Sequence, residues 1–130
     1  MTVAEIFSAE GEPSFRARET DALSSLASRP RSVVACGGGV VLSEFNRATL
    51  QSMGTVAYLK VTAAETVVRL GGDESRPLLT ANDADAAERL LANREGLYLE
   101  TADLTVETVG CTPGQVADQI VSLLAERSAR

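Results

Sequence analysis

Residues 32–41 read SVVACGGGVV, an apolar run that leads into Gly37, Gly38 and Gly39. Residues 32–36 show no alternation of apolar and polar side chains, which predicts a strand buried on both faces of a parallel sheet. Without side chains, these glycines would let a ligand touch the backbone, and successive N–H groups can bind an anion. A flexible connection between a strand and a helix accounts for the same glycines equally well.

Strand and helix patterns alternate along the rest of the chain. Residues 55–61 and 104–108 are β-rich runs that predict two further strands. N-cap residues, prolines suited to a first turn and terminating glycines predict helices. The predicted helices begin near residues 3, 13, 44, 63, 83 and 113, with Ser43, Thr62 and Thr112 as N-caps. This alternation predicts one α/β domain, residues 1–130, with a largely parallel sheet.

Composition excludes several classes of function. The chain has 18 acidic and 12 basic residues, and its formal charge of −6 argues against a nucleic-acid partner. It has no histidine, so histidine bases and the common zinc sites are excluded. No apolar stretch spans a bilayer and no secretory leader is recognisable, which predicts a cytoplasmic protein without a membrane partner. Cys36 and Cys111 lack a CxxC spacing, and a disulfide between them is the less favoured alternative.

Arginine dominates the basic residues. Lys60 is the only lysine, and the planar guanidinium of arginine suits carboxylates and phosphates, although a genome that favours arginine explains the same bias. Arg16 and Glu19 lie three positions apart on a predicted helix. They form either an exposed ion pair or, through Arg16, a grip on a substrate carboxylate. Arg94 lies near a predicted helix end, where it binds a ligand or only complements the helix dipole.

Residues 71–82 are rich in glycine and polar side chains, which predicts a mobile loop. Arg76 in this loop can close over a triphosphate and neutralise charge during phosphoryl transfer, although most loop arginines are simply solvated. A P-loop requires G-x-x-x-x-G-K-[ST], in which the lysine reaches the phosphates and the hydroxyl holds Mg²⁺. The sequence contains no such motif, since Lys60 lies in a predicted strand with no glycine before it.

Seven short motifs follow one another along the chain: EIF, GE, FR..E, GGG, RPLL, R..LY and AD. In this order and spacing, residues 2–127 resemble shikimate kinase, a P-loop family of the nucleoside-monophosphate-kinase type. The resemblance implies a parallel-sheet P-loop kinase fold. It also implies transfer of the γ-phosphoryl group of ATP, with Mg²⁺, to the 3-hydroxyl of shikimate, on the way to chorismate and the aromatic amino acids.

The resemblance implies a role for each matching residue on the substrate side. Arg16 and Arg94 would bind the shikimate carboxylate, and Glu19 would orient Arg16. A glycine turn would lie against the ring and hydroxyls of shikimate. Its residues are Gly37, Gly38 and Gly39.

The resemblance implies fewer residues on the nucleotide side. Arg69 would pack beside the adenine, Arg76 would belong to a lid at about residues 71–82, and Thr112 with Pro113 would edge the same pocket. The family's Mg²⁺ ligands have no counterpart in this sequence.

The sequence departs from the family's pattern at its start. The similarity is already under way at residue 2, after the family's first βαβ unit, which holds the P-loop, a magnesium ligand and a D-x-D pair. We therefore expect a truncated P-loop kinase fold without its first two strands, which binds nucleotide poorly and is inactive alone. Residues 33–36 and 55–61 would present unpaired, aggregation-prone edges unless they pair with each other.

Three alternatives stay open. One is a non-catalytic module that binds shikimate. Another is a split enzyme that is completed by a separate P-loop chain. The third is a kinase of the same fold that acts on a different small molecule, which the glycines and the paired arginines favour less than a carboxylated, hydroxylated ring.

Overall fold

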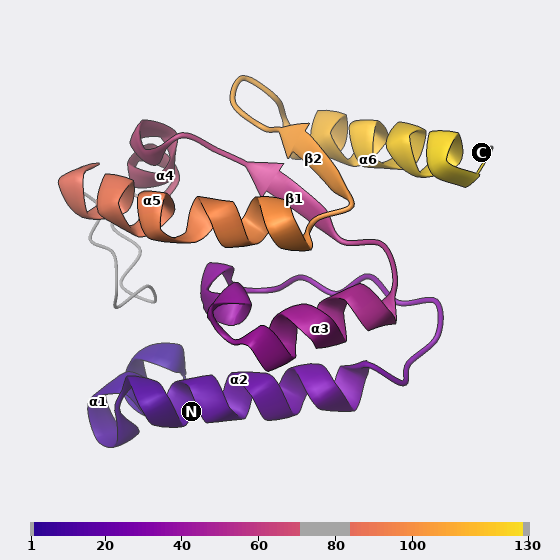
Figure 1. The fold of residues 1–130 in the computed structure, drawn as a ribbon. Coiled ribbons are helices and arrows are strands. Elements are labelled where there is room, and N and C mark those ends of the chain that lie inside the picture. Colours follow the sequence, from indigo (N-terminus) through magenta and orange to yellow (C-terminus); the bar gives the residue numbers. More distant parts are fainter. Residues whose placement is uncertain (1, 71–83, 129–130) are drawn as a thin grey trace.

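The computed structural model describes residues 2–70 and 84–128 (Figure 1). Within these ranges the chain is rich in helix and has a small parallel sheet. The elements, in chain order, are α1 (Val3–Glu10), α2 (Glu12–Leu26), the 3₁₀ turn η1 (Gly38–Leu42), α3 (Glu44–Met53), β1 (Ala57–Lys60), α4 (Ala63–Leu70), α5 (Ala84–Thr101), β2 (Leu104–Glu107) and α6 (Pro113–Ser128).

The predicted N-caps are confirmed. The Ser43 hydroxyl accepts a hydrogen bond from the N–H of Asn46 at 3.2 Å, and the Thr62 hydroxyl accepts one from the N–H of Glu65 at 3.1 Å. Before α6, Thr112 and Gln115 form a reciprocal capping box with bonds of 2.8 and 3.1 Å. Each cap satisfies N–H groups that have no partner inside the helix, so these helices start where the local sequence places them.

Helices α1 and α2 form a hairpin that presents Arg16. Gly11 joins them with φ 84°, a conformation that favours glycine because it has no Cβ atom. Its N–H donates to the carbonyls of Ile6 and Phe7 at 3.2 and 3.0 Å. The rings of Phe7 and Phe15 pack across the hairpin with their centroids 5.0 Å apart.

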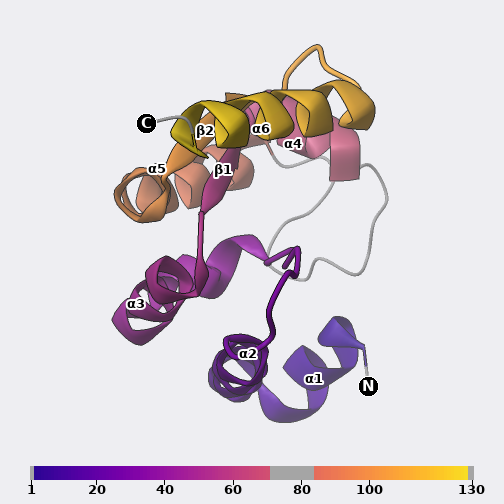
Figure 2. The same cartoon turned by 90° about the vertical axis from the view of Figure 1, so that its right-hand side faces the viewer.

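Strands β1 and β2 pair in parallel, from Ala57 opposite Leu104 to Lys60 opposite Glu107. Helix α5 lies on one side of the strands and α6 on the other (Figures 1 and 2). At each end of the β1–β2 pair, a side chain hydrogen-bonds to the backbone of the other segment. The Asp103 carboxylate accepts from the N–H of Val56 at 2.7 Å, and the Thr108 hydroxyl donates to the Lys60 carbonyl at 2.8 Å.

The prediction of a strand at residues 32–36 is wrong. The chain from Ser32 to Gly37 forms no strand, and the side chain of Val33 is fully exposed, at 101%. In the part of the chain that the structure describes, β1 pairs with β2 and not with this segment. An apolar run becomes a strand only where a neighbouring strand completes its hydrogen bonds, and here no neighbour does so. Residues 33–36 and 55–61 therefore do not close on each other.

The η1 turn packs against three helices, α2, α3 and α5 (Figure 1). Leu23 of α2 packs with Val40 and Val41 of η1 in a buried cluster. Partly buried side chains surround this cluster: Leu50, Met53, Leu97 and Tyr98. The glycines that precede Val40 are consequently held against α2 and α5 by apolar packing.

Two further observations concern the cysteines and the membrane-spanning potential of the helices. Cys36 and Cys111 are free thiols in the structure. Of the helices in residues 2–70 and 84–128, none has both the length and the apolar character needed to cross a membrane.

Leu23→Ala should lower the free energy of unfolding by about 2–5 kcal/mol, because it leaves a cavity beside η1. The matched control is Val33→Ala, which removes an exposed apolar side chain and should change stability by less than about 0.5 kcal/mol. Urea unfolding followed by circular dichroism measures both. A comparable loss at Val33 would mean that residues 32–36 are buried after all.

Candidate functional site

The glycine turn lies in close contact with side chains from two helices. A Cβ atom added to Gly38 would lie 2.7 Å from the Tyr98 hydroxyl oxygen, and one added to Gly39 would overlap the Arg16 guanidinium. At Gly37 it would meet only Glu19 Oε2, at an ordinary 3.6 Å. A side chain at Gly38 or Gly39 would therefore have to displace the Tyr98 hydroxyl or the Arg16 guanidinium. The interpretation as a merely flexible connection is wrong, because the turn is a 3₁₀ element packed into the core.

Arg16 is held between two carboxylates of its own helix. Its Nε and one Nη donate to Glu12 Oε2 at 3.3 and 3.1 Å, and the other Nη donates to Glu19 Oε1 at 3.0 Å. Only 23% of the Arg16 side chain and 14% of the Glu19 side chain are exposed, so the interpretation as an exposed surface pair is wrong. The guanidinium also lies over the Phe15 ring, 5.1 Å from its centroid.

Arg94 is buried, with 8% of its area exposed. One of its Nη atoms lies 3.7 Å from the position of a Cβ on Gly38, so the guanidinium adjoins the glycine turn. Among the described residues, no carboxylate forms an ion pair with it. Arg94 lies about two turns before the end of α5, and no basic residue occupies the last turn, so the helix-dipole interpretation is wrong. An enclosed guanidinium without a counter-charge is unfavourable unless an anion joins it.

Sequence reasoning missed two neighbours of this site. Tyr98 donates a hydrogen bond to the Gly38 carbonyl at 2.8 Å, and Glu12 pairs with Arg16. Both follow a spacing that was visible in the sequence, because Tyr98 is four residues after Arg94 and Glu12 is four before Arg16. Residues at that spacing share one helix face.

Cys36 adjoins the same turn but is poorly suited to act as a nucleophile. Partial enclosure of the thiol and, after it, the negative charge of Glu19 raise the pKa of Cys36 above its ordinary value. A raised pKa favours the protonated thiol, whereas the reactive species is the thiolate.

The sequence profile of the shikimate kinase family matches residues 1–125 of this chain. The chain belongs to the shikimate kinase family. A shikimate kinase of Vibrio campbellii is 42% identical over 126 residues, which are 96% of this chain and 73% of that protein. One of Rhodococcus jostii is 39% identical over 126 residues, 96% of this chain and 74% of that protein.

A solved structure supports the same assignment. The shikimate kinase of Acinetobacter baumannii, in complex with shikimate, superposes with a TM-score of 0.93 at 36% sequence identity. The match covers 99% of this chain and 73% of that one. The predicted class, a parallel-sheet P-loop kinase fold, is therefore confirmed, although the part of this chain that the structure describes contains only two strands.

Of the nucleotide-side residues that the resemblance to shikimate kinase implies, only Thr112 and Pro113 have described side chains. Arg69 belongs to α4, but its side chain lies outside the described residues, as do Arg76 and the proposed lid at residues 71–82. Thr112 uses its hydroxyl and its N–H in the cap of α6, and Pro113 has no N–H to offer. Their roles toward a nucleotide stay predictions.

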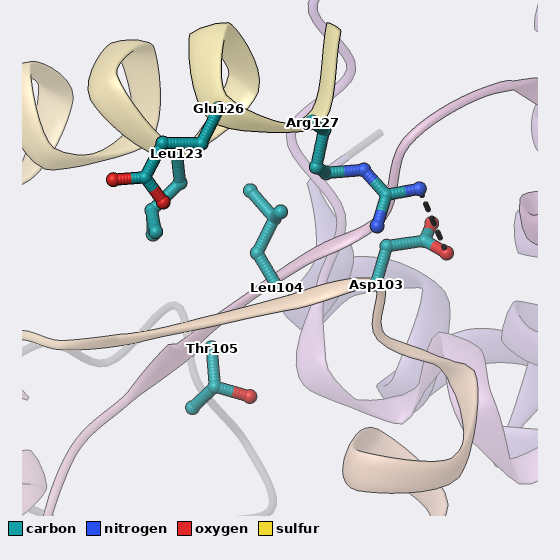
Figure 3. A pocket seen from close by; sticks show the side chains of 6 residues that line it. All are labelled: Asp103, Leu104, Thr105, Leu123, Glu126 and Arg127. Carbon is teal, nitrogen blue, oxygen red and sulfur yellow. Dashed lines mark ion pairs between the residues drawn. The ribbon is translucent and has the colours of Figure 1, made fainter. Parts of the chain in front are cut away.

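A cavity of about 180 Å³ lies elsewhere, between β2 and α6 (Figure 3). Leu104 and Leu123 line it, and an ion pair of 3.7 Å between Arg127 and Asp103 lies at its edge. Of the residues that match the shikimate kinase motifs, only Asp103 of the AD motif lines this cavity, and none of the predicted site residues does so. We therefore place the candidate site of this family member at η1, where the buried cation is.

Gly39→Ala should lower the free energy of unfolding by about 1–3 kcal/mol, because the new methyl group displaces the Arg16 guanidinium from its two carboxylates. Gly96→Ala is the matched control, because Gly96 lies within α5 and has open space around it. That change should raise stability by about 0.5–1 kcal/mol. Urea unfolding distinguishes the two signs, and a neutral or stabilising Gly39→Ala would refute the close contact.

Proposed function

We propose that this chain binds shikimate at the η1 turn and is the acceptor-binding part of a shikimate kinase. In the complete reaction, the γ-phosphoryl group of ATP is transferred to the 3-hydroxyl of shikimate. One observation carries the proposal: Arg94 is buried beside Gly38 without a carboxylate partner among residues 2–70 and 84–128. The family membership and the shikimate complex of the A. baumannii enzyme support it.

Arg94 and Arg16 are not equivalent in this proposal. Glu12 and Glu19 neutralise Arg16, so the attraction for the shikimate carboxylate comes chiefly from Arg94. A guanidinium has five N–H donors, and three of those on Arg16 are engaged. Arg16 therefore keeps N–H donors for a ligand while Glu12 and Glu19 hold its plane in place.

The glycine turn supplies the shape of the proposed pocket. The Cβ position of Gly38 lies 2.7 Å from the Tyr98 hydroxyl and 3.7 Å from an Nη atom of Arg94, and that of Gly39 lies against the Arg16 guanidinium, so this turn packs directly beside both arginines. In this proposal the hydroxylated ring lies against the Gly37–Gly39 turn while its carboxylate meets Arg94. Carboxylate recognition by a buried arginine also sets the orientation of the ring.

ATP and Mg²⁺ are the cofactors of the complete reaction in our proposal, but the described residues do not fit them. The polar groups of Thr112 are already paired in the cap. Within the described ranges, no group of three acidic or cysteine side chains is placed to hold a metal ion. The chemistry that we assign to this chain is therefore binding, orientation and charge compensation of the acceptor.

Shikimate binding should depend on Arg94. Calorimetric titration of the folded chain with shikimate should give a measurable Kd, and Arg94→Ala should weaken binding by about 2–4 kcal/mol, because the carboxylate loses a buried, charged donor. Arg18→Ala is the matched control, since Arg18 is an exposed arginine of α2 that pairs with Glu10. Equal affinity of the native chain and Arg94→Ala, or no heat with the folded native chain, would contradict the proposal.

The 130-residue chain should not phosphorylate shikimate by itself, since its sequence lacks the lysine and hydroxyl of a Walker A motif. ADP release from ATP, Mg²⁺ and shikimate, measured with a coupled assay, should stay at the background rate. Turnover above background would overturn this part of the proposal.

The missing motif also favours a second candidate function, a shikimate-binding module that complements a separate P-loop chain. Mixing this chain with a separately produced chain that carries the Walker A unit of a shikimate kinase should then give ADP release that neither chain shows alone. The mixture of that unit with the Arg94→Ala variant is the control, and no gain with the native chain would exclude complementation.

A further inference from the structure

We infer that Tyr98 is a positioning residue for shikimate binding: its hydroxyl holds the Gly38 peptide in the orientation that the ligand requires. The inference rests on the proposed function, because it concerns the same site. Tyr98 lies one turn after Arg94 on α5, so a single helix face carries both the buried cation and the group that orients the turn beside it.

The hydrogen bond from Tyr98 to the Gly38 carbonyl measures 2.8 Å and joins residues that lie 60 positions apart in the chain. The same hydroxyl occupies the space of a Gly38 Cβ atom, at 2.7 Å. The peptide is planar and trans, so a carbonyl that points toward Tyr98 directs the N–H of Gly39 to the opposite side. Tyr98 therefore fixes the direction of both polar groups of this peptide.

The Tyr98 ring is fixed in place by packing against a second aromatic ring, that of Tyr58. The Tyr58 ring of β1 packs against it, with centroids 4.9 Å apart and planes inclined by 33°. The Tyr58 hydroxyl donates to Glu95 Oε2 at 2.8 Å, and Glu95 Oε1 lies 3.7 Å from Lys60 Nζ. These contacts tie the ring to β1 and α5 together, so its hydroxyl has a defined place relative to Arg94.

Tyr58 keeps the proton that it donates. Burial and, after it, the hydrogen bond to Glu95 and the charge of Glu95 raise the pKa of Tyr58 above the ordinary tyrosine value. The Tyr58 hydroxyl therefore stays protonated in the neutral pH range and keeps its bond to Glu95.

A preformed turn lowers the cost of binding, because the ligand does not have to order the peptide itself. Without the hydroxyl, the Gly38 carbonyl would lose its donor from α5 and the turn would sample other orientations. Phenylalanine at this position keeps the ring, its packing on Tyr58 and its place in the apolar cluster. The hydroxyl is thus separable from the structural role of the ring.

The test compares two variants that each remove one hydroxyl of α5. Tyr98→Phe removes the bond to Gly38, and Thr101→Val removes the 2.7 Å bond from the buried Thr101 hydroxyl to the Leu97 carbonyl. Titration calorimetry of the full chain with shikimate should give a Kd that is about three- to tenfold higher for Tyr98→Phe, the range expected when one neutral hydrogen bond is lost. The Kd of Thr101→Val should stay within about twofold of the native value.

Each outcome decides the inference. If the native chain binds shikimate and Tyr98→Phe binds equally well, or if both variants weaken binding equally, Tyr98 has only a structural role and the inference is wrong. In those cases the proposed function stands. If the folded native chain does not bind shikimate, the proposed function fails and the inference falls with it.

A second measurement tests the contact without ligand. Gly38→Ala places a methyl group against the Tyr98 hydroxyl, whereas the next ring atom, Cζ, lies at an ordinary 3.8 Å. The loss of stability caused by Gly38→Ala should therefore be smaller in the Tyr98→Phe background than in the native one. An equal loss in both backgrounds would show that the hydroxyl does not lie against this glycine.

Discussion

Two side chains from different helices occupy the volume that Cβ atoms would take at Gly38 and Gly39. The Arg16 guanidinium comes from α2 and the Tyr98 hydroxyl from α5. Both groups reach the η1 backbone because Gly38 and Gly39 have no side chains. This contact gives the turn its conformation, and it leaves the buried Arg94 beside the same peptide. The same turn therefore carries the polar contacts and the apolar packing, because Val40 and Val41 come directly after Gly39 and are buried in the core.

The charges around the turn are distributed unequally. Arg16 has two carboxylate partners on its own helix, whereas no carboxylate pairs with Arg94 in the described part of the chain. Arg16 is already neutralised, so it acts mainly as a rigid hydrogen-bond donor. Arg94 is enclosed and has no carboxylate partner among the described residues, so it supplies the electrostatic attraction for an anionic ligand. The spacing of Glu12 and Glu19 around Arg16 already indicates its pairing in the sequence, whereas the burial of Arg94 is visible only in the structure.

Local signals were sufficient to predict most of the fold. The starts of α3, α4 and α6 follow from Ser43, Thr62 and Thr112, because a capping hydrogen bond depends on residues within one turn. Local signals could not decide whether residues 32–36 form a strand. An extended apolar run becomes a strand only through a neighbour, and the neighbour is not encoded in the run itself. Family motifs supplied Arg16, Arg94 and the glycines.

Contacts between distant segments were beyond sequence reasoning. The bond between Tyr98 and Gly38 requires α5 to lie on the η1 turn, and the tertiary packing that places it there involves Leu23 and Leu97 from separate helices. The spacing between Arg94 and Tyr98 indicated a shared helix face but not what that face would meet. The pairing of Glu12 with Arg16 was accessible from spacing alone, since both residues belong to α2.

The exposed Val33 and the outer edge of β1 have a consequence for how copies of this chain behave toward one another. Within residues 2–70 and 84–128, β1 pairs on one edge only, and an exposed apolar side chain or an unpaired edge is a place where a second copy could add a strand. A formal charge of −6 at pH 7 makes such copies repel one another. That repulsion vanishes near the isoelectric point of about 4.6, so mild acid should bring a minimum of colloidal solubility.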